Sequence, residues 1–161
     1  MARKPARWVA ALKRALAQPR KASARTRLGA EPLTDRVVPA LTLTALAGVP
    51  DVVTGVGLQG SLRYCIEVAN ASSEANVVIH LQPGKLYTLT RGNGYFGAGA
   101  QENGNQTGDL DIRDLGGVVG VKTYTIVGNG ATIRQLALDR VFHILGSDVF
   151  VRFQNVTISG G

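Results

Sequence analysis

Three acidic residues that lie close together in the sequence are the strongest candidates for chemistry in this chain. Asp109 and Asp111 alternate in the segment DLDIRD, and Asp114 closes it. Carboxylates that alternate along a strand share one face, and Ca²⁺ is held by oxygen ligands of this kind. We therefore predict Asp109, Asp111 and Asp114 as metal ligands, with Ca²⁺ as the candidate ion. Two other interpretations stay open: solvated acids at a strand edge, and the paired acids of a glycoside hydrolase.

Histidine and cysteine add little to this set. His80 and His143 each lie between apolar neighbours in a strand-like segment, which favours a surface or structural role over that of a catalytic base. Cys65 is the single cysteine, so the chain forms no internal disulfide and has no CxxC metal motif. The pair Asp139-Arg140 predicts a turn or a local ion pair. We therefore assign no catalytic residue from the sequence.

Positive charge is concentrated at the N-terminus. The whole chain carries a net charge of +7, and residues 1–36 hold ten Lys or Arg and only two acids. The remaining residues are therefore almost neutral. A nucleic-acid-binding domain carries its basic residues on the folded part, so this distribution argues against a nucleic-acid partner.

The segment of residues 1–40 is predicted to be a basic leader, mostly disordered or a short helix. Its longest apolar run, from Trp8 to Leu12, is too short to span a membrane. The segment RLGAEPLTDRVVPA resembles the LEDR-x-x-PA motif found in the basic leaders of large bacterial surface or secreted proteins. The matching core positions are Leu33, Asp35, Arg36, Pro39 and Ala40. This resemblance implies export to the cell surface or the extracellular space.

One amphipathic helix stands out in a chain that otherwise reads as strands and turns. In GSLRYCIEVAN, Leu62, Cys65, Ile66 and Ala69 recur at helical spacing and predict a helix over residues 62–70. Ser61 precedes it as an N-cap residue. Cys65 on the apolar face is expected to be a small buried hydrophobic residue. We expect the opposite face to turn Arg63, Glu67 and Asn70 to solvent.

Short strands and corners rich in Gly or Asn fill residues 41–161. Strands are predicted at 41–45, 77–81, 86–90, around 110–112, at 124–127, 132–133 and 141–145, and in two pieces split near Gln154-Asn155. Residues 91–108 form a long glycine-rich loop. The phrase Thr125-Ile126-Val127-Gly128 recurs as Thr157-Ile158-Ser159-Gly160 and suggests a repeat.

This pattern predicts an all-β domain that is either a β-solenoid or an antiparallel β-sandwich. Helical crossovers between the strands are absent from the pattern, which excludes a doubly wound α/β fold. Very short strands and the recurring phrase favour the solenoid. A solenoid needs its first coil covered, and an amphipathic helix ahead of the regular strands suits that purpose.

The helix segment is similar to the CSLREAI-x-x-AN signature that opens many bacterial pectin-lyase-like proteins. The matching residues are Ser61, Leu62, Arg63, Ile66, Ala69 and Asn70, while Gly60 and Cys65 depart from the signature. Further likeness extends in the same order over about residues 58–161. The resemblance implies a right-handed parallel β-helix, here incomplete, with an N-terminal capping helix at about 62–70.

These observations predict a non-enzymatic, exported β-helix module with a scaffold or adhesion role and contact to polysaccharide through residues 91–108. The first alternative is a truncated remnant of a polysaccharide lyase or glycoside hydrolase, for which Arg134, Arg140 and Arg152 are the available basic residues. The second alternative is a β-sandwich adhesin domain. We expect the chain to be a piece of a longer protein, and its partners to be further coils or a second copy bound end to end.

Overall fold

The computed structural model describes residues 40–51, 57–92 and 103–161. Every described element belongs to one compact unit, Val37–Gly161. The basic leader and the motif residues Leu33, Asp35, Arg36 and Pro39 lie outside the described residues, as does most of the glycine-rich loop. Within the described part, no helix is long and apolar enough to cross a membrane.

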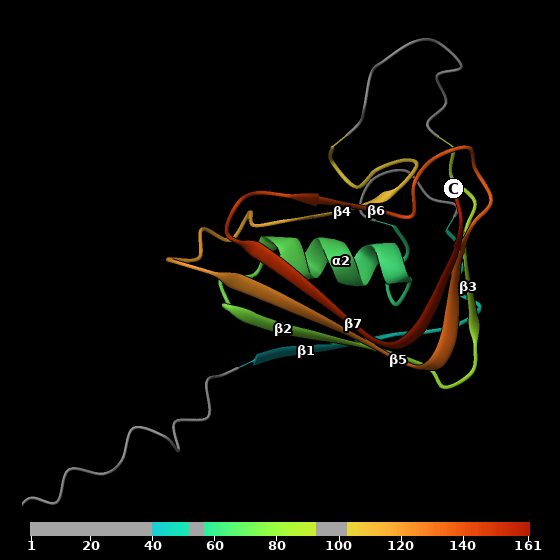
Figure 1. Ribbon diagram of the computed structural model, residues 1–161, viewed down its shortest axis with the longest axis horizontal. Coiled ribbons are helices and arrows are strands. Elements are labelled where there is room, and N and C mark those ends of the chain that lie inside the picture. The colour runs from blue at the N-terminus through green and yellow to red at the C-terminus, as the bar shows by residue number, and fades with distance from the viewer. Residues whose placement is uncertain (1–39, 52–56, 93–102) are drawn as a thin grey trace, which may run out of the picture. The chain divides into compact units, whose positions relative to one another are not determined.

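The described part consists mostly of β-strands around one α-helix (Figure 1). In chain order the elements are β1 (Ala40–Ala45), α2 (Leu62–Ala71), β2 (Asn76–Leu81), β3 (Leu86–Leu89), β4 (Leu110–Arg113), β5 (Lys122–Gln135), β6 (Phe142–Leu145) and β7 (Val149–Gly160). The sequence therefore predicted the all-β class and the place of each strand correctly.

All strand pairs among these elements are parallel and form three ladders. The first contains β1, β2, the first half of β5 and the first half of β7; the second contains β3 and the second halves of β5 and β7. The third contains β4 and β6. The antiparallel pairing that a β-sandwich requires is absent from the described strands.

β5 and β7 are each continuous but bent, where the sequence predicted separate strands. The bend in β5 falls at Asn129, with φ of 51°, and the bend in β7 at Asn155, with φ of 47°. The register between the two strands shifts at this point. Asn tolerates the left-handed conformation, so the predicted corners were placed correctly although the strands run through them.

The two bends stack closely, and Gly128 makes this stacking feasible. A Cβ atom at Gly128 would lie 2.4 Å from the carbonyl oxygen of Asn155 and 2.5 Å from the Cβ of Val156. The recurring phrase is not the structural repeat, because Thr125 pairs with Arg152 and Thr157 pairs with Thr132. The two phrases therefore lie at different positions of the ladders.

The core lies between the ladders and α2. Its central side chains are fully buried and almost all aliphatic, among them Ile66, Ile79, Leu110, Ile126 and Ile133. Burial of each such side chain contributes roughly 1.5–3 kcal/mol to folding. Figure 1 shows α2 lying between the β4–β6 pair and the ladder of β1 and β2. The helix therefore fills the space between these two groups of strands.

The helix has the predicted bounds and cap but not the predicted solvent face. Ser61 accepts a hydrogen bond from the Tyr64 N–H at 3.1 Å, as an N-cap should. Cys65 is buried as expected, and burial raises the pKa of its thiol to about 11. The prediction that Arg63 and Asn70 face solvent is wrong: they are 1% and 0% exposed. Arg63 binds the Asp51 carboxylate and backbone carbonyls, and Asn70 binds backbone groups of β4.

Candidate functional site

Two of the three predicted acidic ligands lie together, and a histidine joins them. Asp111 of β4 is the register partner of His143 of β6, so their side chains lie on the same face of adjacent parallel strands. Asp109 precedes Asp111 by two positions and shares that face. Ligand atoms of Asp109, Asp111 and His143 all lie within 4.8 Å of one another. The side chains of Asp109 and Asp111 are 2% and 0% exposed, and that of His143 is 22% exposed.

Arg140 covers this group from the solvent side. Its Nε donates to Asp109 Oδ2 in a short ion pair, and its Nη2 lies 3.1 Å from His143 Nδ1. The ion pair raises the pKa of the Arg140 guanidinium. The Arg140 side chain is 37% exposed. The sequence offered no reason to place an arginine beside Asp109, because the two residues come together only through the pairing of β4 with β6.

Asn105 orients the buried carboxylate of Asp111. Its backbone N–H donates to Asp111 Oδ2 at 2.9 Å, and its side-chain oxygen accepts from the Asp111 N–H at 3.3 Å. Asn105 adopts a left-handed conformation with φ of 56° and is fully buried. Its Nδ2 also donates to the carbonyl of Arg63 at 3.1 Å. The turn before β4 is therefore connected to both the carboxylate and the helix.

Arg63 connects the first turn of α2 to the segment that carries the cluster. Its guanidinium holds Asp51 in a bidentate ion pair with N–O distances of 2.7 and 3.0 Å. It also donates to the carbonyl oxygens of Gly108 and Asp109, each at 2.8 Å, and of Asn105 at 3.3 Å. Arginine supplies five donors in a rigid fork, which is why it can serve this many acceptors at once. Helical periodicity alone assigns Arg63 to the outer face of the helix, so this role could not be predicted from the sequence.

Asn70 performs a similar task at the other end of α2. Its Nδ2 donates to the Asp111 carbonyl at 2.8 Å and its Oδ1 accepts from the Arg113 N–H at 3.1 Å. The amide thus pairs with β4 much as a neighbouring strand would. Tyr124 adds its hydroxyl at 3.1 Å from the same Oδ1. The Asn70 side chain is therefore a structural link between helix and β4.

Asp114 lies apart from the grouped ligands and serves a turn. It accepts from the N–H groups of Gly116 and Val118 and from Lys122 Nζ, the last at 3.2 Å. Burial acts to raise the pKa of Asp114, but the Val118 hydrogen bond and Lys122 outweigh it and hold that pKa below its usual value. Lys122 also donates to the carbonyls of Asn70 and Ser72 at the end of α2. The three-carboxylate set predicted for Ca²⁺ is therefore not brought together by the described side chains.

The remaining candidates are dispersed. Arg134 is exposed on β5 and Arg152 is exposed on β7. Asp139 Oδ1 accepts from the backbone N–H of Arg140 at 2.9 Å, and the Arg140 side chain forms its ion pair with Asp109. His80 is half-buried on β2 and is not part of the cluster.

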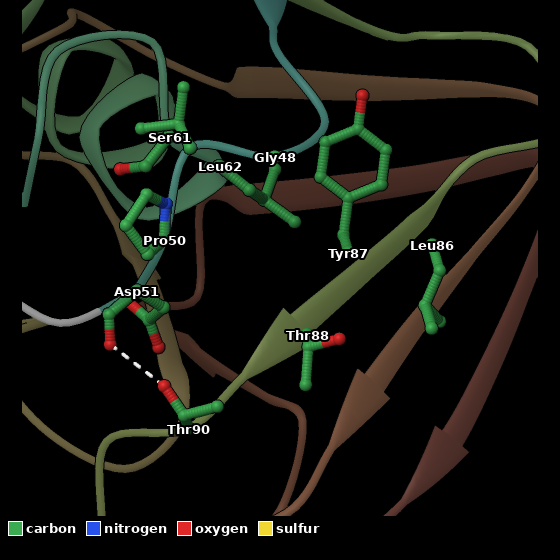
Figure 2. A pocket seen from close by; sticks show the side chains of 10 residues that line it. Gly48, Pro50, Asp51, Ser61, Leu62, Leu86, Tyr87, Thr88 and Thr90 are labelled. Carbon is green, nitrogen blue, oxygen red and sulfur yellow. Dashed lines mark hydrogen bonds between the residues drawn. The ribbon is translucent and has the colours of Figure 1, made fainter.

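A pocket of about 300 Å³ lies next to the Asp51–Arg63 pair. Figure 2 shows its lining, which includes Pro50, Asp51, Tyr87 and Thr90. Thr90 Oγ1 donates to the Asp51 carbonyl at 3.0 Å, and the Tyr87 hydroxyl donates to the Ala45 carbonyl at 2.8 Å. These two hydroxyl groups are engaged with the chain itself, so they add no reactive group to the cluster.

Comparison of the chain with models of known protein families, with curated proteins and with solved structures found no match.

Proposed function

We propose that this chain is the helix-capped beginning of a right-handed parallel β-helix and that it serves as a non-enzymatic, exported scaffold or adhesion module. The parallel pairing of all described strands in three ladders supports the proposal. The burial of α2 against β1 and β4 supports a capping role for the helix. The signature residues from Ser61 to Asn70 and the leader motif support the assignment to exported proteins of this kind.

The observation that carries the scaffold proposal is the change in burial between β5 and β7. Ile133 of β5 is 0% exposed, while its register partner Ile158 of β7 is 42% exposed. Ile133 has strands on both sides, β3 and β7, whereas among the described strands β7 pairs only with β5. A strand with a free edge and uncovered core side chains is a template for a further strand. We propose that this edge receives further coils of a longer protein or the end of a second copy of the chain.

Sedimentation of the full chain with two matched lysine variants tests this role. Ile158→Lys places a charge in the inward column of β7. Phe150→Lys places the same charge on the outward side of the same strand, where Phe150 is 58% exposed. We expect the parent chain to self-associate, Ile158→Lys to be monomeric and Phe150→Lys to behave like the parent. A chain that stays monomeric at high concentration would contradict binding of a second copy, and an equal effect of both variants would contradict the role of this edge.

A second candidate function is a remnant of a polysaccharide lyase or glycoside hydrolase. The grouping of two buried carboxylates with Arg140 and His143 favours it. The first proposal predicts no cleavage when the full chain is incubated with polygalacturonate and Ca²⁺. Formation of unsaturated product that disappears in Asp109→Asn would establish the enzymatic alternative instead. Binding of the intact chain to immobilised polysaccharide, without cleavage, is the outcome expected of an adhesion module.

A further inference from the structure

We propose that Asp109, Asp111 and His143 bind one divalent transition-metal ion such as Zn²⁺, and that the ion takes the place now occupied by the guanidinium of Arg140. This site is independent of the scaffold role. It differs from the predicted Ca²⁺ site because it contains an imidazole nitrogen and excludes Asp114.

The backbone brings the three ligands to one place. Asp111 and His143 are register partners on adjacent strands, and Asp109 lies two residues before Asp111 on the same face. Their ligand atoms lie within 4.8 Å of one another, a spacing from which small side-chain movements bring all three into contact with one ion. Three protein ligands with an open position are typical of zinc sites that also hold water.

His143 Nδ1 is the atom that points most directly to a cation. It lies 3.1 Å from Asp111 Oδ1 and 3.1 Å from Arg140 Nη2. A carboxylate oxygen only accepts a hydrogen bond and a guanidinium nitrogen only donates one. A single ring nitrogen satisfies one of these neighbours and leaves the other facing a group of its own kind. A metal ion in place of the guanidinium resolves the conflict, because the ring nitrogen and the carboxylate oxygen then both act as electron-pair donors.

The groups around the ligands already hold them in place. The Asn105 N–H fixes Oδ2 of Asp111, so that Oδ1 remains directed to His143. Arg63 holds the carbonyl of Asp109 at 2.8 Å and so fixes the backbone of this ligand. Hydrogen bonds of this kind orient metal ligands and raise metal affinity. Arg140, by contrast, is more than a third exposed and can move into solvent when an ion enters.

The donor set favours a transition metal over Ca²⁺. Imidazole suits Zn²⁺, Ni²⁺ and Cu²⁺, whereas Ca²⁺ requires a larger set of oxygen ligands. With Asp114 engaged by Lys122 and the turn at Gly116, the cluster offers two carboxylates only. We therefore expect affinity to fall in the order Zn²⁺, Mn²⁺, Ca²⁺.

The test is a calorimetric titration of the full chain, prepared without a histidine tag, with ZnCl₂, MnCl₂ and CaCl₂. We expect one Zn²⁺ per chain. Arg140→Gln removes the competing charge and is expected to tighten Zn²⁺ binding about tenfold or more, whereas the exposed Arg134→Gln leaves it unchanged. His143→Gln is expected to weaken binding at least about tenfold, whereas His80→Gln leaves it unchanged.

A second readout uses the fact that the chain has only two histidines. Addition of Zn²⁺ should shift the ring ¹⁵N signals of His143 and leave those of His80 in place, which tests the site in the parent chain even if a ligand variant fails to fold. Absence of Zn²⁺ uptake by the parent chain overturns the proposal. So does Zn²⁺ binding that is as tight in His143→Gln as in the parent chain, or that is weakened by Arg140→Gln. None of these results depends on self-association of the chain, so the site and the scaffold role fail or stand separately.

Discussion

Replacement of Arg63 by methionine is expected to be the most damaging single change on α2. Methionine keeps much of the aliphatic volume but removes every donor of a side chain that is 1% exposed. Asp51, 7% exposed, then loses its bidentate partner, and the carbonyls of Gly108 and Asp109 lose their 2.8 Å donors. Removal of one partner of a buried ion pair costs about 3–5 kcal/mol. For a domain of this size, this loss lowers the melting temperature by roughly 10 °C or more.

The assay is urea unfolding followed by circular dichroism, with Arg134→Met as the control because Arg134 is exposed. The control should change the free energy of unfolding by less than about 0.5 kcal/mol. A double variant, Arg63→Met with Asp51→Leu, should recover part of the loss, because it removes the unpaired buried carboxylate. A loss below about 1 kcal/mol in Arg63→Met, or a double variant that loses the full sum of the single losses, would refute the role assigned to this ion pair.

Three further outcomes are expected. Gly128→Ala should destabilise the chain by about 1–3 kcal/mol in urea melts, because its Cβ would lie 2.4 Å from the Asn155 carbonyl oxygen in the stacked bend of β7. The control Gly92→Ala should have little effect, because its Cβ would meet only the methyl group of Ala137 at 3.9 Å. The folded-state pKa of Asp114 lies below its ordinary value of 3.8, so its contribution to stability is present above about pH 3.8 and is lost as the pH falls through the folded pKa. The difference in unfolding free energy between the parent chain and Asp114→Asn should therefore shrink in acid. A difference that grows in acid would contradict this role of Asp114. Cys65, with its thiol pKa raised to about 11 by burial, should resist a thiol reagent at pH 8 in the native chain and react at once in urea; rapid native-state labelling would show that the helix does not stay packed.

Local interactions explain what could be predicted from the sequence. The helix begins after Ser61 and carries Cys65 and Ile66 on its buried face because cap preference and apolar spacing act within a few residues. The bends at Asn129 and Asn155 were placed correctly because the left-handed conformation is a property of the residue itself. Strand positions followed from short apolar alternations in the same way.

Side-chain partners that are distant in sequence were decided by the tertiary structure alone. Arg63 and Asn70 were assigned to solvent because helical periodicity indicates only one buried face of the helix. In the structure, the turn at Asn105 and strand β4 cover a second face of the helix. Asp114 was grouped with Asp109 because they are close in sequence, yet it binds Lys122 at the start of β5.

The cluster of Asp109, Asp111, Arg140 and His143 shows the physical reason most clearly. Its members come from two segments about 30 residues apart, and they meet only because β4 and β6 pair in parallel with Asp111 opposite His143. A shift of that register by one residue would turn alternate side chains to the other face and separate the group. The amino-acid sequence by itself determined which segments become strands and where they bend, through interactions that span a few residues. The register between strands, which depends on how the whole core packs, determined which charged side chains face one another.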